Sequence, residues 1–312
     1  MFGLSTSQKR VGWVSVTLQG DTARLVHIVR PAGGKPRVEW VASQPMAQPA
    51  TLWPTLRKQW QLDKYSVVAV LPRGQYQMVS MEAPEVPREE WISALRWKLK
   101  DVVDFPVEQA AIDVLAVPGA TPESPARSVL AVTASEERVR PLVDHCNDAG
   151  VGLEAIDIVE SGLRNLCALT DDSERAQALI RVGPMDTQLV ITYRSELLMV
   201  RHIEATSAQI TDPEDDVRQT VFDRIALEAQ RTLDMCERLF SYANLGHLWV
   251  APGLGAPGLV EYLRDVVYVT VTEMKLSDVL DISNAAELSS PEAQSAFAAA
   301  LGAALRDEPG AP

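Results

Sequence analysis

The most constraining feature of this 312-residue sequence is a strand–turn–strand pattern that occurs twice. Residues 11–16 and 23–29 predict two strands joined by a turn at Gln19, Gly20 and Asp21. After an acidic segment at 171–174 the pattern restarts, with strands predicted at 178–182, 187–193 and 197–203. A chain of this length exceeds what one hydrophobic core usually supports. We therefore expect an α/β protein of two lobes, each opened by one such unit.

Further strands and helices follow each unit. Short apolar runs rich in β-branched residues predict strands at 37–42, 64–71, 112–117, 129–133 and 247–251. Helical spacing of apolar residues and flanking breakers predict helices at 87–103, 136–149, 160–169, 221–240, 259–265 and 291–305. Apart from the strand at 37–42, the segments 31–60 and 205–220 are predicted loops. In the helix at 87–103, Trp97 falls on the otherwise polar side.

Composition narrows the class of protein. Hydrophobic residues make up 46% of the chain and charged residues 23%, so most of it can fold. The net charge of -13, without a cluster of lysine and arginine, argues against nucleic acid as a partner. No apolar run approaches the roughly 18 residues that a membrane span requires, and no leader pattern opens the chain. We expect a cytoplasmic protein.

The residues that most often build metal and catalytic sites are scattered. Three cysteines without a C-x-x-C pair fit a reducing compartment better than disulfides or zinc. They are Cys146, Cys167 and Cys236. The four histidines show no metal-ligand spacing, and each is predicted to be structural: His27, His145, His202 and His247. We expect no catalytic residues and no metal site.

The order of these pieces resembles the actin-like ATPase superfamily. The matching pieces are the two strand–turn–strand units, a strand ending in a glycine turn before a helix at 248–265 (LWVAPGLGAPGLVEYLRD), and the alanine-rich segment 300–306. Residues 84–117 (PEVPREEWISALRWKLKDVVDFPVEQAAIDVLAV) resemble the inserted subdomain of the type IV pilus biogenesis proteins PilM and, more closely, MshI. The chain is therefore similar to the MshI/PilM family.

The resemblance implies an actin-like (RNase H-like) two-lobed fold with a PilM-type inserted subdomain. The first lobe is expected at 1–172, with the insert at about 73–128, the second lobe at 173–284, and a helix returning to the first lobe plus a tail at 285–312. It also implies a cytoplasmic scaffold of a type IV pilus inner-membrane platform, similar to that of the mannose-sensitive haemagglutinin (MSHA) pilus. The implied partners are a PilN-like bitopic membrane protein, through which the chain is peripheral to the inner membrane, and other pilus platform proteins.

The chain departs from nucleotide-hydrolysing relatives where they need carboxylates. In those relatives each strand–turn–strand unit begins with an aspartate, because a carboxylate must hold magnesium or orient water. Here the first unit has no acid before Asp21, and Arg181 stands at the expected aspartate of the second. Pro184 also removes an amide that a phosphate would use. We expect no ATP hydrolysis, with ATP at most an optional ligand.

The resemblance still implies candidate nucleotide-binding residues. Gly183 and Thr187 belong to the second phosphate-binding turn, and Gly253 and Gly255 to the adenosine motif. Glu228 and Arg231, in RIALEAQRTLDM (224–235), would close over the base. The alternative is a tight turn beside an ordinary salt-bridged helix. Asp186 either replaces a lost carboxylate or is a turn aspartate that bonds its own backbone.

Candidate partner-binding residues lie in the insert. Trp97, with Asp104 and Phe105, belongs to a partner surface, or else another part of the same chain covers the tryptophan, because an exposed aromatic is costly. The resemblance implies a groove beside the insert that takes the N-terminal cytoplasmic peptide of a PilN-like protein.

Three other functions stay open at the level of sequence. The first is a working ATPase or sugar kinase of the same fold that uses nonstandard acids such as Asp186 or Asp21. The second is a filament-forming actin relative. The third is a cytoplasmic scaffold of type II secretion.

Overall fold

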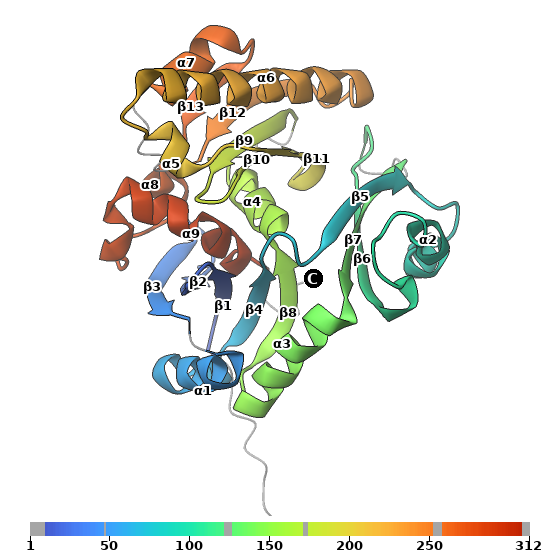
Figure 1. The fold of residues 1–312 in the computed structure, drawn as a ribbon, viewed down its shortest axis with the longest axis vertical. Coiled ribbons are helices and arrows are strands. Elements are labelled where there is room, and N and C mark those ends of the chain that lie inside the picture. The colour runs from blue at the N-terminus through green and yellow to red at the C-terminus, as the bar shows by residue number, and fades with distance from the viewer. Residues whose placement is uncertain (1–9, 47, 122–126, 171–173, 252–257, 308–312) are drawn as a thin grey trace, which may run out of the picture.

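Two five-stranded sheets with the same strand order form the body of the molecule (Figure 1). The computed structural model describes residues 10–46, 48–121, 127–170, 174–251 and 258–307. The first sheet has the order β3-β2-β1-β4-β8 and the second β11-β10-β9-β12-β13. A third sheet, β5-β7-β6, stands beside them. The repeated pattern in the sequence therefore becomes a repeated sheet topology.

The first sheet combines an antiparallel meander with two parallel strands. Its strands are β1 (Trp13–Gln19), β2 (Thr22–Val29), β3 (Arg37–Pro45), β4 (Ser66–Leu71) and β8 (Leu153–Ile158). β1 pairs with β2 antiparallel and with β4 parallel. Every residue of β4 is buried, as expected for an apolar strand with a neighbour on each side and helices on both faces.

The second sheet repeats this arrangement. Its strands are β9 (Ala176–Val182), β10 (Thr187–Tyr193), β11 (Glu196–Ile203), β12 (Leu245–Val250) and β13 (Thr270–Glu273). β9, β10 and β11 form the antiparallel meander, and β12 joins β9 in parallel. Arg194 and Ser195 connect β10 to β11 with positive φ angles, the backbone of a two-residue turn that matches strand twist.

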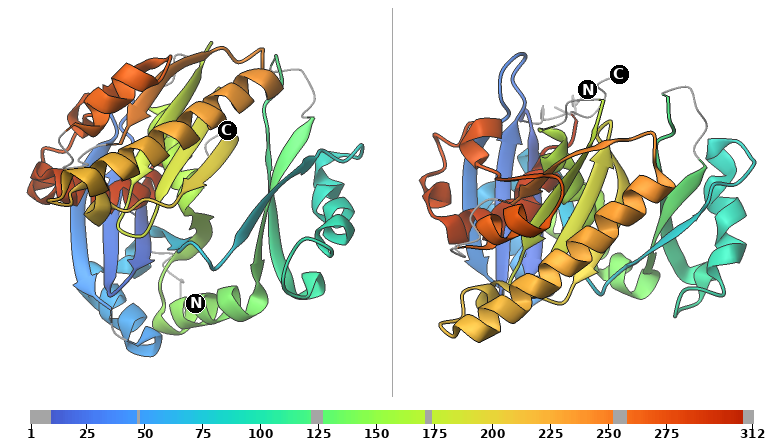
Figure 2. Two further views of the ribbon diagram at one scale, coloured as in Figure 1. Left: turned by 45° about the horizontal axis from the view of Figure 1, so that its top comes forward. Right: turned by 90° about the horizontal axis from the view of Figure 1, so that it is seen from above.

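Helices cover both faces of each sheet. α1 (Pro49–Trp60) and α3 (Glu136–Ala149) pack on one face of the first sheet, where Trp53, Leu56 and Cys146 join its core. α6 (Asp215–Leu239) and α7 (Leu259–Val266) cover the outer face of the second sheet (Figure 2). α4 (Val159–Ala168) and α9 (Pro291–Ala304) lie between the two sheets.

The crossing of α4 and α9 holds the two lobes together. A Cβ atom on Gly302 would lie 1.8 Å from the Gly162 carbonyl oxygen, so the two backbones meet at glycine. On one side of this crossing, Ser15 Oγ donates to the Ala300 oxygen at 2.6 Å. On the other, Ser295 Oγ donates to the Val182 oxygen at 3.0 Å. One helix therefore bonds to both sheets.

The insert has a small core of its own. It comprises β5 (Gln77–Glu82), α2 (Trp91–Leu99), β6 (Ala110–Ala116) and β7 (Ser128–Ser135). α2 packs Leu95 and Leu99 on one face of the three-stranded sheet. Leu115 and Leu130 pack from this sheet against the core of the second lobe. The insert stands to one side of the two larger sheets (Figure 2, right).

Several elements differ from the sequence-based expectation. The predicted loop at 31–60 contains α1, although Pro54 lies inside that helix. The predicted loop at 205–220 contains α5 (Ser207–Ile210) and the start of α6. The helix expected at 87–103 begins with a 3₁₀ turn (Arg88–Glu90) and ends at Leu99, leaving Val102 half exposed. β5, β8 and β13 were not expected, because short strands rely on tertiary partners more than on pattern.

We predict that Gly302→Ala destabilises the protein by about 3 kcal/mol, because its methyl group would collide with the Gly162 backbone, which cannot move aside cheaply. Urea unfolding followed by circular dichroism measures the loss. Gly246→Ala is the matched control: its nearest atoms, 3.2 Å away, belong to the flexible Arg175 and Gln177 side chains. Equal stabilities of the two variants would contradict the proposed crossing.

Candidate functional site

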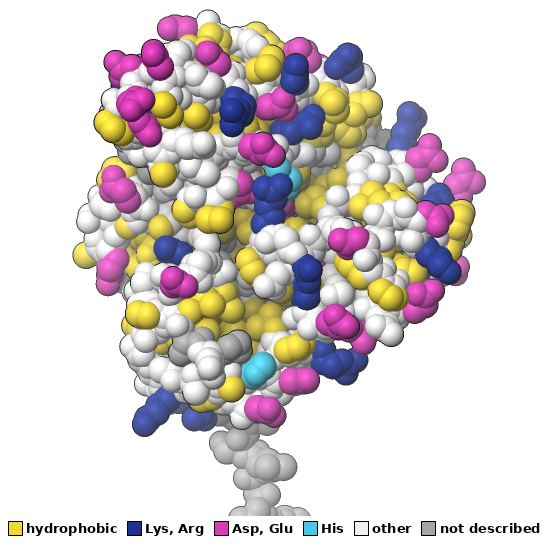
Figure 3. Space-filling view, viewed as in Figure 1, with side chains coloured by type: hydrophobic (Ala, Val, Ile, Leu, Met, Phe, Trp, Pro, Cys, Tyr) yellow, Lys and Arg dark blue, Asp and Glu magenta, His cyan; other side chains and the backbone are white. Residues whose placement is uncertain are grey.

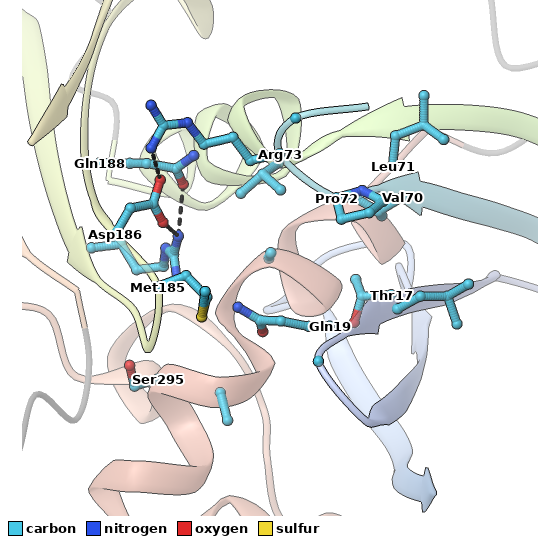
Figure 4. Close-up of a pocket in the computed structure, with 17 residues that line it drawn as sticks. Thr17, Gln19, Val70, Leu71, Pro72, Arg73, Met185, Asp186, Gln188 and Ser295 are labelled. Atoms are coloured by element: carbon cyan, nitrogen blue, oxygen red, sulfur yellow. Dashed lines mark hydrogen bonds and ion pairs between the residues drawn. The ribbon is translucent and has the colours of Figure 1, made fainter. Parts of the chain in front are cut away.

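A cavity of about 500 Å³ lies where the two strand–turn–strand units face each other (Figure 4). The β1–β2 turn lines it with Gln19 and Gly20, and the β9–β10 turn lines it with Met185 and Asp186. Arg73 enters from the segment after β4, and α9 contributes Ser295. We call this cavity the cleft.

Arg181 occupies the floor of the cleft. It is 5% exposed, and its Nη2 atom donates to Gln188 Oε1 at 2.8 Å and pairs with Asp186 Oδ1 at 3.2 Å (Figure 4). A Cβ atom on Gly183 would lie 1.9 Å from Arg181 Nη1. The guanidinium group therefore lies directly against the glycine turn, and only glycine leaves room for it.

The turn residues that the sequence singled out are bonded within the protein. The Gly183 N–H donates to the backbone carbonyl oxygen of Asp186 at 2.8 Å, closing the β9–β10 turn. Thr187 Oγ1 donates to the Ala205 oxygen at 2.9 Å and is fully buried. The structure thus places Gly183 against Arg181 with its amide engaged, the Thr187 hydroxyl group is bonded to Ala205, and neither residue lines the cleft cavity.

Behind Arg181 lies a second buried layer. Glu160, at the start of α4, has no exposed surface and accepts a short hydrogen bond from the Tyr76 hydroxyl group. His202 Nε2 lies 3.2 Å from Glu160 Oε1, and its Nδ1 lies 3.6 Å from Asp186 Oδ2. Gln188 Nε2 donates to Glu160 Oε1 at 3.4 Å. Arg73 Nη1 pairs with Asp186 Oδ2 at 3.0 Å.

These side chains form one hydrogen-bonded group that we call the cleft cluster: Arg73, Tyr76, Glu160, Arg181, Asp186, Gln188 and His202. Sequence reasoning missed four of them, Arg73, Tyr76, Glu160 and Gln188, and it left His202 as an ordinary structural histidine. A charged residue directly after an apolar pair, as Glu160 follows Ile158 and Val159, is the signal that could have drawn attention to them.

Titration in the cluster follows from these contacts. Hydrogen bonds to Asp186 and Glu160 raise the pKa of His202 above its ordinary value, against the effect of burial. Burial acts to raise the pKa of Asp186, but His202, Arg181 and Arg73 outweigh it and lower the pKa. Burial lowers the pKa of Arg181, while Asp186 and Glu160 oppose that shift. The cluster therefore favours ionised Asp186 and protonated His202.

The residues of the cleft do not fit a metal–nucleotide complex. Asp186 is the one carboxylate among the described residues that line the cavity, and both of its oxygens already face arginines. Within the described ranges, no three His, Cys, Asp or Glu side chains are grouped to hold a metal ion. The Ser15 hydroxyl group on β1, before the first turn, is bonded to α9.

Comparison with solved structures decides the fold. The PilM–PilN type IV pilus biogenesis complex matches with a TM-score of 0.72 and 20% sequence identity, covering 95% of this chain and 98% of that chain. A Bacteroides thetaiotaomicron protein with an actin-like ATPase fold and unknown function matches with a TM-score of 0.52 and 11% identity, over 90% of this chain and 96% of that one. This chain has the actin-like ATPase fold. The expected fold class is confirmed.

Other comparisons add little to the actin-like assignment. The cytoplasmic domain of EpsL, from the type II secretion system of Vibrio cholerae, matches with a TM-score of 0.46 and 14% identity, over 77% of this chain and 81% of that one. That score is too low to support an argument about function. No protein-family model and no curated protein matches the chain. Among the described residues, no helix is both long and apolar enough to cross a membrane.

The adenosine motif of the actin-like fold is only partly visible. Gly253 and Gly255 lie outside the described residues. Glu228 and Arg231 pair with each other on α6 at 2.8 Å, and Arg201 approaches Glu228 at 3.8 Å. Neither residue of that pair lines the cleft cavity. The two side chains form an ion pair on the surface of α6, and their role in nucleotide binding stays a prediction.

No described part of the chain covers Trp97. It is 67% exposed on α2, and Lys98 Nζ lies 5.8 Å from its ring centroid. Asp104 is exposed and Phe105 is half buried in the segment after α2. Among the described residues, the alternative in which another element of the chain buries Trp97 is not observed.

A groove lies between the insert and the second lobe. Its volume is about 620 Å³, and it is lined by Met81, Val117, Leu239, Phe240 and Tyr242 together with polar groups. Leu239 is 62% exposed at the end of α6. Figure 3 shows the surface hollowed beside the insert, with hydrophobic side chains in the hollow. Sequence spacing had not identified this groove.

We predict that His202→Gln lowers stability at pH 6 and that the loss shrinks as the pH rises to 9. A raised pKa means that protonated His202 stabilises the fold below its unfolded pKa, about 6.5, and that this contribution disappears as the pH rises through the folded value. Urea unfolding of both proteins at each pH measures the difference. His145→Gln, on α3, is the control. A difference that is constant from pH 6 to 9 would contradict the role of the charge.

Proposed function

We propose that this chain is a cytoplasmic, actin-like scaffold of a type IV pilus inner-membrane assembly platform. It holds the N-terminal cytoplasmic tail of a PilN-like membrane protein, and other platform proteins bind to it in the same assembly. It is peripheral to the inner membrane through that partner. It does not hydrolyse ATP. The resemblance of residues 84–117 to MshI favours a pilus of the MSHA type.

One observation carries the proposal. The match with the PilM–PilN complex leaves only 5% of this chain uncovered, which is about 16 of 312 residues. The insert, at 73–128, spans 56 residues, so the match must include most of it. An insert is the part of a shared fold that varies between functions. Its inclusion therefore favours a function like that of PilM over other activities of actin-like proteins.

The surface of the insert supports partner binding. Trp97 is exposed, and tryptophan is one of the residues enriched in binding hot spots. So large an apolar side chain is uncommon on a surface that binds no partner. The groove beside the insert has a volume suited to a few side chains of an extended peptide, and its lining is largely apolar. Both features suit the capture of a short tail.

The cleft supports a scaffold rather than an ATPase. Hydrolysis needs a metal ion held by carboxylates and a positioned water molecule. Asp186 is committed to Arg181 and Arg73, and the guanidinium group of Arg181 fills the space against Gly183. An intramolecular cation therefore takes the position from which hydrolysis would be organised.

We predict that a synthetic peptide with the N-terminal cytoplasmic sequence of a PilN-like protein from the same organism binds this chain. Trp97→Ala and Leu239→Ala remove exposed apolar surface at two separate places, since Leu239 lines the groove and Trp97, on α2, does not. Each change should weaken binding about tenfold where the peptide contacts that surface. Fluorescence anisotropy measures the dissociation constants. Tyr268→Ala is the matched control, a half-exposed aromatic residue on the second lobe.

The outcomes of this experiment distinguish whether the chain binds the peptide from where on the chain the peptide binds. A peptide that fails to bind the wild-type chain contradicts the scaffold proposal. A peptide that binds wild type and all three variants equally leaves the scaffold but moves the site away from Trp97 and Leu239.

We predict that the purified chain shows no ATP turnover with magnesium, because Asp186 has no free oxygen for a metal ion. A phosphate-release assay measures the rate, with isothermal titration of ATP and magnesium alongside. Measurable turnover that disappears in Asp186→Asn or Asp21→Asn would instead establish an ATPase with nonstandard acids. Turnover that survives both changes points to a contaminating enzyme.

A further inference from the structure

The cleft cluster joins three parts of the molecule that are far apart in the sequence. Arg73 and Tyr76 belong to the segment at 72–76, which leads from β4 into the insert. Glu160 belongs to α4, between the sheets. Asp186 and His202 belong to the β9–β10 turn and to β11 of the second lobe. Each part contributes a charged group that bonds to one of the others.

The segment at 72–76, which we call the strap, is held from both sides. Arg73 reaches the second lobe through Asp186 at 3.0 Å, and Tyr76 donates to Glu160. Arg138 of α3 donates to the Gly74 oxygen. Because the strap is one of the two chain connections into the insert, a rotation of the insert against the second lobe must break the Arg73–Asp186 pair.

The cluster needs no added cation. Two guanidinium groups, Arg73 and Arg181, and the protonated His202 face two carboxylates, Glu160 and Asp186. A metal–nucleotide complex between the two turns would contact both lobes, and its metal ion would supply positive charge to carboxylates there. Here side chains supply the charge and make the contacts. The cleft does not need a ligand to be closed.

We infer that the cleft cluster is a built-in clamp that joins the insert, α4 and the second lobe in the place of a metal–nucleotide complex. Arg181 provides the fixed internal cation, since it is buried and cannot leave without exposing the turn. Arg73 provides the movable arm, since its side chain is 51% exposed and its only clamp partner is Asp186. This inference concerns the cleft and does not depend on the identity of any partner.

Hydrogen–deuterium exchange of the full chain, read by mass spectrometry, tests the clamp. In Arg73→Gln we expect amides at 73–77 and at 183–188 to exchange about tenfold faster than in wild type, because losing a hydrogen-bonded charge lets both sides of the cleft open more often. Arg73→Lys, which keeps the charge, should restore most of the protection at 183–188. Arg140→Gln is the matched control, since Arg140 pairs with Glu136 at 3.0 Å on the surface of α3.

The readout separates a clamp from a local surface pair. If faster exchange in Arg73→Gln is confined to 73–77, or is absent, the two sides of the cleft are not joined by Arg73 and the inference is wrong. Adding ATP and magnesium to wild type should leave exchange at both segments unchanged. Magnesium-dependent protection there would show that a ligand closes the cleft, which also overturns the inference. Since Arg73 is half exposed, its replacement leaves the core intact.

Discussion

The ion pair between Arg181 and Asp186 determines what the centre of this molecule can do. A buried guanidinium group is tolerated only when carboxylates and hydrogen-bond acceptors surround it. Gln188 and Asp186 accept hydrogen bonds from Arg181 directly. Glu160 and His202 lie behind them, with Glu160 bonded to Gln188 and His202 close to both carboxylates. The Arg181 side chain also requires a glycine at 183, because any side chain there would occupy the place of the guanidinium group. The cleft between the two turns is therefore built around a buried cation.

The same pair links the cleft to the rest of the architecture. Asp186 pairs with Arg73 of the strap, the segment that leads into the insert. The position of the insert therefore depends on a contact with the second lobe. Nearby, α4 and α9 cross at two glycines, and α9 bonds to both sheets. The backbone contact between α4 and α9 and the buried charges of the cleft cluster therefore both contribute to the interface between the two lobes. An interface of this kind suits a protein that presents a surface to partners in a constant orientation.

The insert is the part of the molecule least constrained by that interface. Its small core holds α2 on the three-stranded sheet, while Trp97 remains outside it. The second face of the sheet contacts the second lobe and leaves the groove near Leu239. The exposed Trp97 and Leu239 side chains are tolerated because other apolar residues of the insert and of the second lobe already form the buried cores. The proposed partner surface is therefore a consequence of how the insert is mounted.

The amino-acid sequence alone determined the repeated strand–turn–strand units, the resemblance that led to the actin-like fold, and the loss of acids at the turns. These features are local: periodic burial, a glycine beside a turn, an arginine where an aspartate is expected. The tertiary structure alone decided that Arg181 is bonded to Asp186 and Gln188, that Arg73 joins Asp186 from the cleft, and that Glu160 and His202 meet behind them. It also decided that Trp97 is exposed and that Glu228 and Arg231 lie away from the cleft. Those outcomes depend on contacts between segments far apart in the chain, and spacing within one segment carries no information about them.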